Sequence, residues 1–242
     1  MSIFVLIHGS WHGGWCWSKL SQRLEAKGHK VYAPDLPGHG SDKTPVNRIT
    51  LGSYVQTVCR IIDAEHDPVV LVGHSRGGIV ISQTAEVRAR KVRQLVYLAA
   101  FLLQTGEQMI QRAVEDTDSL IPPHLTFSED RSYHVIKDPE MLKEIFYGDC
   151  ENADVREAVS RFVPEPTRPI ETHLKLTEEN YGRVPRYYIG TLRDNAVSPM
   201  LQRRMTSAEP CQKLIWMDTS HSPFYSKPDQ LADHLMEISE LS

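Results

Sequence analysis

The chain has 242 residues, of which 40% are hydrophobic and 24% are charged, as in ordinary globular proteins and unlike disordered or fibrous ones. Its 27 Lys and Arg residues against 31 Asp and Glu residues give a net charge of −4, without the basic excess that is typical of a nucleic-acid-binding protein. No apolar run approaches the roughly 18 residues of a spanning helix, so we expect no membrane segment.

The first hundred residues alternate strand and helix signals. The N-terminus has no basic region and no small-residue cleavage site, so it does not look like a signal peptide. Residues 3–7 form a continuous apolar run, which is typical of a strand covered on both faces. Thr50 stands where it can cap a helix with one apolar face. Strands are predicted at 3–7, 29–33, 69–72 and 92–98, and helices at 17–24, 51–62 and 77–89.

The alternation breaks at residues 103–183, which carry helical fragments at 140–146 and 154–162 and several prolines. Strand signals return at 186–189 and 213–217, with helices near 198–207 and 228–241. This pattern predicts a mainly parallel sheet with helices on both faces. We therefore divide the chain into a core, residues 1–102 and 184–242, and a helical cap, residues 103–183. An insertion of this length is more often a functional lid than a plain loop.

The candidate nucleophile is Ser75. The segment Val69-Val70-Leu71-Val72-Gly73-His74-Ser75-Arg76-Gly77 has the order strand, G-x-S-x-G motif, helix. A turn this sharp needs glycines, and it presents the serine hydroxyl at the carboxyl edge of the sheet and at a helix N-terminus. The motif alone is common, but its place directly after an apolar strand is specific. The alternative is a glycine-rich turn with an inert serine.

A catalytic serine needs a base, and the base needs an orienting acid. His221 and Asp194 each follow a different predicted strand, in the chain order Ser, Asp, His that this type of site uses. We therefore expect Ser75, Asp194 and His221 to meet at one edge of the sheet. Asp218, three residues before His221, and Asp35, after an early strand, are rival acids, and chain order favours Asp194.

Acyl transfer also needs two N–H donors for the developing oxyanion. One is expected from the backbone of Arg76, the residue after the nucleophile. The other is expected from the loop that follows the first strand, His8-Gly9-Ser10-Trp11-His12-Gly13-Gly14, with Ser10 as the candidate. Only backbone atoms are required at these two positions.

With these motifs, the chain resembles the plant salicylate-binding methylesterases and the hydroxynitrile lyases of the α/β-hydrolase superfamily, together with their bacterial esterase relatives. The resemblance covers nearly the whole length and is weakest in the cap. It is carried by Phe4-Val5-Leu6-Ile7-His8-Gly9, His12-Gly13-Gly14-Trp15, Gly28-His29-Lys30-Val31, Val70-Leu71-Val72-Gly73-His74-Ser75, Leu98-Ala99-Ala100-Phe101 and the loop at His221.

The resemblance implies an α/β-hydrolase fold with about six mainly parallel strands. It implies Ser75 as nucleophile, His221 as base, Asp194 as acid, and Ser10 and Arg76 as oxyanion donors. It also implies an enzyme without cofactor and a possible homodimer. The plant enzymes usually have an apolar residue where this chain has Arg76, so its guanidinium is a departure. We expect that side chain to turn outward into solvent or to form a salt bridge rather than to select substrate.

Other signals predict no metal or nucleotide site. His8 and His12 are four apart but lie across a strand end and a glycine loop, and the Gly38-His39-Gly40 segment lacks a third glycine at the fingerprint position. Four scattered cysteines, without a C-x-x-C pair, predict free thiols and a cytoplasmic protein.

We therefore predict a serine carboxylic-ester hydrolase that acts through an acyl-enzyme on small to medium, mostly apolar esters. One alternative is a hydroxynitrile lyase with the same triad. The lyases of the group carry a Lys after the catalytic His and a Thr after the first-strand His, where this chain has Ser222 and Gly9. The other alternative is a small-molecule receptor on a hydrolase scaffold.

Overall fold

The centre of the protein is a six-stranded parallel sheet in the order β2-β1-β3-β4-β8-β9. The structure is a computed structural model that describes residues 1–241. Central β3 pairs with β1, where Leu6 lies opposite Val72, and with β4, where Val72 lies opposite Val96. The strands are β1 (Ile3–Ile7), β2 (Lys30–Tyr32), β3 (Val69–His74), β4 (Val92–Leu98), β8 (Arg186–Thr191) and β9 (Lys213–Met217). The predicted parallel sheet is confirmed.

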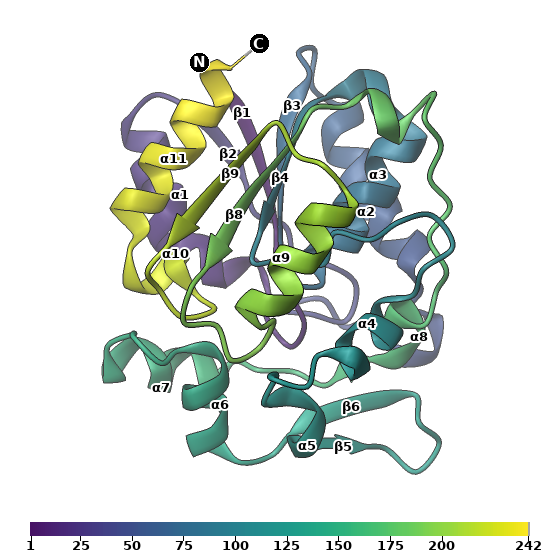
Figure 1. Ribbon diagram of the computed structural model, residues 1–242, viewed down its shortest axis with the longest axis vertical. Coiled ribbons are helices and arrows are strands. Elements are labelled where there is room, and N and C mark those ends of the chain that lie inside the picture. Colours follow the sequence, from purple (N-terminus) through teal and green to yellow (C-terminus); the bar gives the residue numbers. More distant parts are fainter. Residues whose placement is uncertain (242) are drawn as a thin grey trace.

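Helices cover both faces of this sheet (Figure 1). One face carries α1 (Ser18–Ala26), α10 (Pro223–Ser226) and α11 (Pro228–Glu240), and the other carries α2 (Leu51–Asp63), α3 (Gly77–Arg88) and α9 (Pro199–Ala208). Short 3-10 turns span Gly14–Trp17, Val46–Arg48, Ala89–Lys91 and Tyr181–Arg183. Within residues 1–241, no helix is both long enough and apolar enough to cross a membrane.

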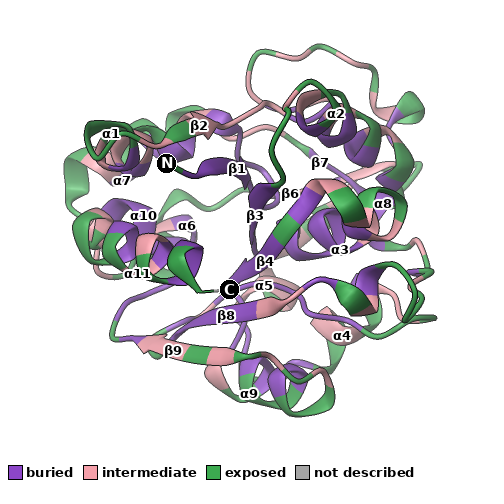
Figure 2. Ribbon diagram, turned by 90° about the horizontal axis from the view of Figure 1, so that it is seen from above, coloured by how far each residue is buried: buried purple, intermediate pink, exposed green. Residues whose placement is uncertain are grey.

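Alternating side chains of the strands supply two hydrophobic layers. In β1, Val5 and Ile7 belong to the core cluster that includes residues of α2 and α3, and Phe4 and Leu6 belong to the cluster that includes residues of α1 and α11. All four are fully buried, and each such side chain contributes roughly 1.5–3 kcal/mol on leaving water. Figure 2 shows the same gradient, with buried central strands and partly exposed edge strands β2 and β9.

The predicted helix after Thr50 is confirmed, and its start has a local cause. The Thr50 side chain accepts a hydrogen bond from the Ser53 N–H, and the Ser53 hydroxyl accepts one from the Thr50 N–H. This reciprocal capping satisfies two of the amide groups that a helix N-terminus leaves without partners. The apolar positions of α2 then face the sheet, among them Tyr54, Val58 and Ile62.

The segment from α4 (Met109–Glu115) to α8 (Thr167–Ile170) lies across the carboxyl ends of the strands, opposite both chain termini, and the residues that follow α8 return along the side of the core, where Thr177 and Tyr181 bond Glu86 of α3 (Figure 1). Residues 103–183 contain the two expected helices, α6 (Pro139–Phe146) and α7 (Asn152–Ser160), and three short helices that the sequence pattern did not indicate, α4, α5 (Ile121–His124) and α8. They also contain a small antiparallel sheet that the sequence analysis missed, in the order β5 (Leu125–Phe127), β6 (Tyr133–Ile136), β7 (Glu165–Pro166). Its strands are two to four residues long and only partly apolar, too short for a period-2 signal.

Candidate active site

Ser75 lies on a tight turn between β3 and α3, with a positive φ of 53° that a serine rarely adopts. The two motif glycines are required by close packing. A Cβ at Gly73 would come within 2.6 Å of the Gly77 carbonyl oxygen, and a Cβ at Gly77 within 2.6 Å of the Ile7 carbonyl oxygen. The Ser75 N–H donates to the Leu98 carbonyl, and the Phe101 N–H donates to the Ser75 carbonyl. These bonds to the segment after β4 therefore hold the strained serine in place.

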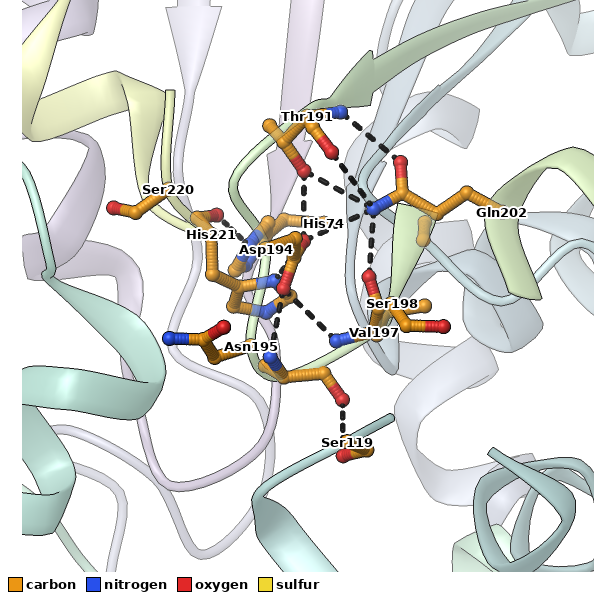
Figure 3. A network of polar contacts seen from close by, with 12 residues as sticks. His74, Ser119, Thr191, Asp194, Asn195, Val197, Ser198, Gln202, Ser220 and His221 are labelled. Carbon is orange, nitrogen blue, oxygen red and sulfur yellow. Dashed lines mark hydrogen bonds and ion pairs between the residues drawn. The ribbon is translucent and has the colours of Figure 1, made fainter. Parts of the chain in front are cut away.

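Asp194, in the loop after β8, is buried and accepts from several donors (Figure 3). Its Oδ1 accepts the backbone N–H groups of Ala196 at 2.8 Å and Val197 at 2.9 Å. Its Oδ2 accepts the Thr191 hydroxyl at 2.7 Å and the Gln202 side-chain amide at 3.1 Å. These donors orient the carboxylate and compensate the cost of burying its charge.

The structure brings His221 onto Asp194, with 2.8 Å between His221 Nδ1 and Asp194 Oδ2. His74, the residue before Ser75, packs its ring 4.4 Å from the His221 ring and hydrogen-bonds the His221 carbonyl at 2.9 Å through Nε2. Figure 3 shows these three side chains together. Among residues 1–241 the buried His221 Nε2 has no hydrogen-bond partner, Ser75 included. The imidazole is therefore held through Nδ1, while Nε2 remains available for proton transfer.

The two rival acids lie elsewhere. Asp218 is largely exposed, with 77% of its side chain accessible, and pairs with Arg193 at 2.8 Å. Asp35 accepts from the backbone N–H groups of Gly14 at 2.7 Å and Ser41 at 2.9 Å and so braces the loop after β1. Of the three carboxylates, Asp194 is therefore the one in contact with His221.

The two candidate oxyanion donors flank Ser75. Ser10 is buried and lines the same pocket as Ser75, and Arg76 begins α3 as its N-cap residue. Within the described part of the chain, neither the Ser10 nor the Arg76 backbone N–H has a protein acceptor. The Trp11 N–H, by contrast, donates to Glu165 at 2.9 Å and is occupied.

The Arg76 side chain does not reach solvent, so the outward orientation is wrong and the salt bridge is what forms. Its guanidinium is fully buried, with 2.8 Å between Arg76 Nε and Glu165 Oε1, an ion pair that is not aligned as a hydrogen bond. It also donates through Nη2 to the Gly9 carbonyl at 3.0 Å and lies 4.6 Å from the Tyr54 ring centre. Sequence reasoning missed Glu165, because an acidic residue between Pro164 and Pro166 carries no signal of its partner.

A small pocket opens onto Ser75 between the parallel sheet and residues 103–183. Its polar atoms come from few side chains, and its walls are mostly apolar, as in sites for small organic ligands. The core and the loop after β1 contribute Ser10, Trp11, Ser75, Phe101 and Ala196, and residues 103–183 contribute Met109, Ile110, Ala113, Ser119, Ile121, Pro122, Leu125, His134 and Ile170.

Buried histidines around the site are held neutral. Burial lowers the pKa of His74 well below its usual value, and the nearby His221 lowers it further. Burial also lowers the pKa of His12 to about 3, although its hydrogen bond to the Ser10 carbonyl opposes the shift. The His12 Nε2 lies 2.6 Å from the Tyr147 hydroxyl, so both ring nitrogens are used within the protein. His12 thereby braces the loop that carries Ser10.

Comparisons with known proteins agree with this architecture. A model of the alpha/beta hydrolase family matches residues 4–234. Methylesterase 7 of Arabidopsis thaliana is 33% identical over 252 residues, which cover 98% of this chain and 96% of the relative. Putative methylesterase 11, chloroplastic, from the same plant is 34% identical over 250 residues, 99% of this chain. This chain spans 64% of the length of that relative and 56% of putative methylesterase 15, chloroplastic.

Two crystal structures extend the likeness. One, of an Arabidopsis methylesterase, has a TM-score of 0.87 at 27% identity, and the superposition covers 100% of both chains. The other, of a pyrethroid hydrolase from Sphingobium faniae, has a TM-score of 0.88 at 27% identity over 99% of this chain and 97% of that one. The family match over nearly the whole length, on a parallel sheet with a serine at its strand-to-helix turn, shows that the chain belongs to the alpha/beta hydrolase family.

Proposed function

We propose that this protein is a serine carboxylic-ester hydrolase with Ser75, His221 and Asp194 as its triad. The observation that carries the proposal is the buried His221–Asp194 pair at 2.8 Å, in which His221 Nε2 has no partner among the described residues and the ring packs 4.4 Å from that of His74, the residue before Ser75. The names of the relatives, which are methylesterases, support ester chemistry. A strained serine, an oriented base and unoccupied backbone N–H groups are the parts that acyl transfer requires.

In the proposed mechanism, His221 Nε2 takes the Ser75 proton as the hydroxyl attacks the ester carbonyl. Asp194 holds the imidazole in the tautomer with its proton on Nδ1 and stabilises the imidazolium that forms. The backbone N–H groups of Ser10 and Arg76 bind the tetrahedral oxyanion. His221 then protonates the departing alcohol, and a water activated by the same imidazole hydrolyses the acyl-enzyme.

The pocket supports small to medium, mostly apolar esters as substrates. Its apolar walls accept a hydrocarbon or aryl group and offer few hydrogen-bond partners to a polar chain. We extend the proposal to methyl esters of apolar acids, because a methyl group is the smallest alcohol portion and the relatives are named for this chemistry. We also propose that residues 103–183 act as the lid of this pocket.

The Ser75→Ala variant tests the assignment. We expect ester turnover to fall by about 10⁶-fold while thermal unfolding stays close to wild type, because the hydroxyl is the nucleophile and contributes little to packing. The measurement is hydrolysis of p-nitrophenyl acetate and of methyl esters of aryl acids. A variant that keeps a tenth of wild-type activity disproves the role of Ser75. A wild-type protein that binds these esters without hydrolysing them is a receptor, the second alternative.

The lyase alternative lacks support at the two positions that separate the groups. Ser222 brings no positive charge for a departing cyanide. A Cβ at Gly9 would lie 2.9 Å from Ser75 Cβ, so this chain has no room for the threonine of the lyases without a shift of Ser75. We expect no cyanide release from mandelonitrile above the uncatalysed rate. Efficient release with negligible ester hydrolysis reverses the assignment.

The cytoplasmic location and the homodimer stay predictions. The four cysteines are free thiols in the structure, which agrees with a reducing compartment. Sedimentation of the purified protein and fractionation of the source cells test the two predictions separately.

A further inference from the structure

Trp11, the neighbour of the candidate oxyanion donor Ser10, is held by three hydrogen bonds that all come from residues 103–183. Its N–H donates to Glu165 at 2.9 Å, its carbonyl accepts the Val163 N–H at 3.1 Å, and its indole N–H donates to the His134 carbonyl at 3.2 Å. The Trp11 backbone has a φ of +60°, a conformation that costs energy in a bulky residue. Surrounding contacts must therefore maintain it.

Glu165 connects this loop to the other candidate donor. It is fully buried, and its carboxylate pairs with the Arg76 guanidinium at 2.8 Å and with His39 Nε2 at 2.8 Å. The Arg76 side chain in turn donates to the Gly9 carbonyl at 3.0 Å. Ser10 thus lies between Gly9, bound by Arg76, and Trp11, bound by Glu165. The buried Arg76–Glu165 ion pair therefore binds both neighbours of Ser10 in the sequence. Arg76 is also the residue whose backbone supplies the second candidate N–H.

The carboxylate is charged at working pH. Burial alone raises the pKa of Glu165, but the Arg76 guanidinium and then His39 outweigh it and lower the pKa to about 2. A buried carboxylate and a buried guanidinium compensate each other, so removal of either one leaves an unpaired charge in the interior. A test of Glu165 must therefore keep the charge balanced.

We propose that Glu165 is a positioning residue for the oxyanion hole, acting through the Trp11 N–H from the cap. The proposal rests on the proposed esterase function and adds that the cap sets the alignment of the catalytic donors as well as covering the pocket. Its contribution is to the transition state, because the negative charge on the carbonyl oxygen is absent from the bound ester and develops as the tetrahedral species forms.

Two charge-balanced double variants isolate the role of the oxygen acceptor. Arg76→Met/Glu165→Gln keeps an oxygen for the Trp11 N–H, and Arg76→Met/Glu165→Met removes it with nearly the same volume. We expect kcat of the Met variant to be about 10²-fold below that of the Gln variant, with KM changed less than about two-fold, since a misplaced donor affects the transition state. Equal kcat values overturn the proposal.

An inhibitor pair separates positioning from loosened packing. An aryl trifluoromethyl ketone forms a hemiketal oxyanion on Ser75, whereas the corresponding secondary alcohol only occupies the pocket. We expect the inhibition constant of the ketone to rise in the Met variant as much as kcat/KM falls, and that of the alcohol to stay constant. Equal weakening of both ligands means a general loss of packing and overturns the proposal.

Hydrogen–deuterium exchange measures how well the backbone amides of residues 8–13 are protected, and it needs no enzymatic turnover. We expect faster exchange in the Met variant than in the Gln variant, because only the Met variant leaves the Trp11 N–H without its acceptor. Equal protection of the loop in the two variants overturns the role of Glu165, whether or not the wild type hydrolyses esters. A wild type that hydrolyses no ester disproves the proposed function instead. Should the Met variant fail to fold, Glu165→Asp withdraws the carboxylate by one methylene with the charge intact. Its kcat is then expected to fall without a change in KM, and an unchanged kcat overturns the proposal.

Discussion

Asp194→Asn is the most informative single change at this site, because the structure dictates where the new amide points. Asp194 Oδ1 accepts two backbone N–H groups, from Ala196 and Val197, which cannot turn away. The amide oxygen of Asn must therefore take the Oδ1 position. Its NH₂ group then replaces Oδ2 and faces His221 Nδ1 across 2.8 Å. A donor now meets the nitrogen that carries the proton in the wild type.

His221 responds by moving its proton to Nε2, so that Nδ1 accepts the new N–H. The imidazole then has no free lone pair toward Ser75, and we expect kcat to fall by about 10⁴-fold, as for the wrong tautomer in other triads. Stability falls as well. The Thr191 hydroxyl and the Gln202 amide both lose Oδ2 as an acceptor, although the Gln202 amide keeps the Val197 carbonyl at 2.7 Å and the Thr191 hydroxyl oxygen at 3.1 Å. We expect a loss of about 0.5–1.5 kcal/mol, the net contribution of one hydrogen bond.

Asp218→Asn is the matched control, since it makes the same chemical change in an exposed carboxylate three residues before His221. We expect its kcat to stay near wild type and its free energy of unfolding to change by less than about 0.5 kcal/mol. Hydrolysis of p-nitrophenyl acetate and urea unfolding measure both quantities. If Asp218→Asn loses more activity than Asp194→Asn, the tautomer argument is refuted and the acid must be reassigned.

Two further changes test the surroundings of the candidate triad. In Gly9→Ala, the new methyl group would lie 2.9 Å from Ser75 Cβ and 3.0 Å from His74 Nδ1, so we expect kcat to fall about 10- to 100-fold as Ser75 shifts, and an unchanged kcat contradicts this packing. His12→Gln tests acid stability: the folded pKa of His12 is about 3 against 6.5 unfolded, so between those values the unfolded chain binds one more proton and stability falls as pH falls. The free energy of urea unfolding between pH 6 and 4 should therefore depend on pH less steeply in the variant, by about 1.4 kcal/mol per pH unit, and equal slopes show that His12 is not buried neutral.

Local signals in the sequence predicted the parallel sheet, which the structure confirms, and the candidate triad, which stays a prediction. The strand at 69–72 and the glycines on either side of Ser75 define a turn through short-range sterics, and the Thr50 cap acts within three residues. Asp194 and His221 were identifiable because parallel strands place their carboxyl ends at one edge, so chain order predicts proximity. Choosing Asp194 over Asp218 rested on that order, and the contact with His221 agrees with it.

Only the tertiary structure decided the arrangement of residues 103–183 and their contacts with the rest of the chain. The small sheet β5-β6-β7 depends on pairing between strands too short to show a pattern alone. Glu165 and Trp11 are 154 positions apart, and nothing near either residue indicates the other. The direction of the Arg76 side chain was likewise open, because a guanidinium is stable in solvent or beside a carboxylate. Only the fold shows that Glu165 Oε1 lies 2.8 Å from Arg76 Nε in the interior. An ion pair between residues so far apart in the sequence forms only when the tertiary fold brings their segments together, and local sequence propensities do not determine that arrangement.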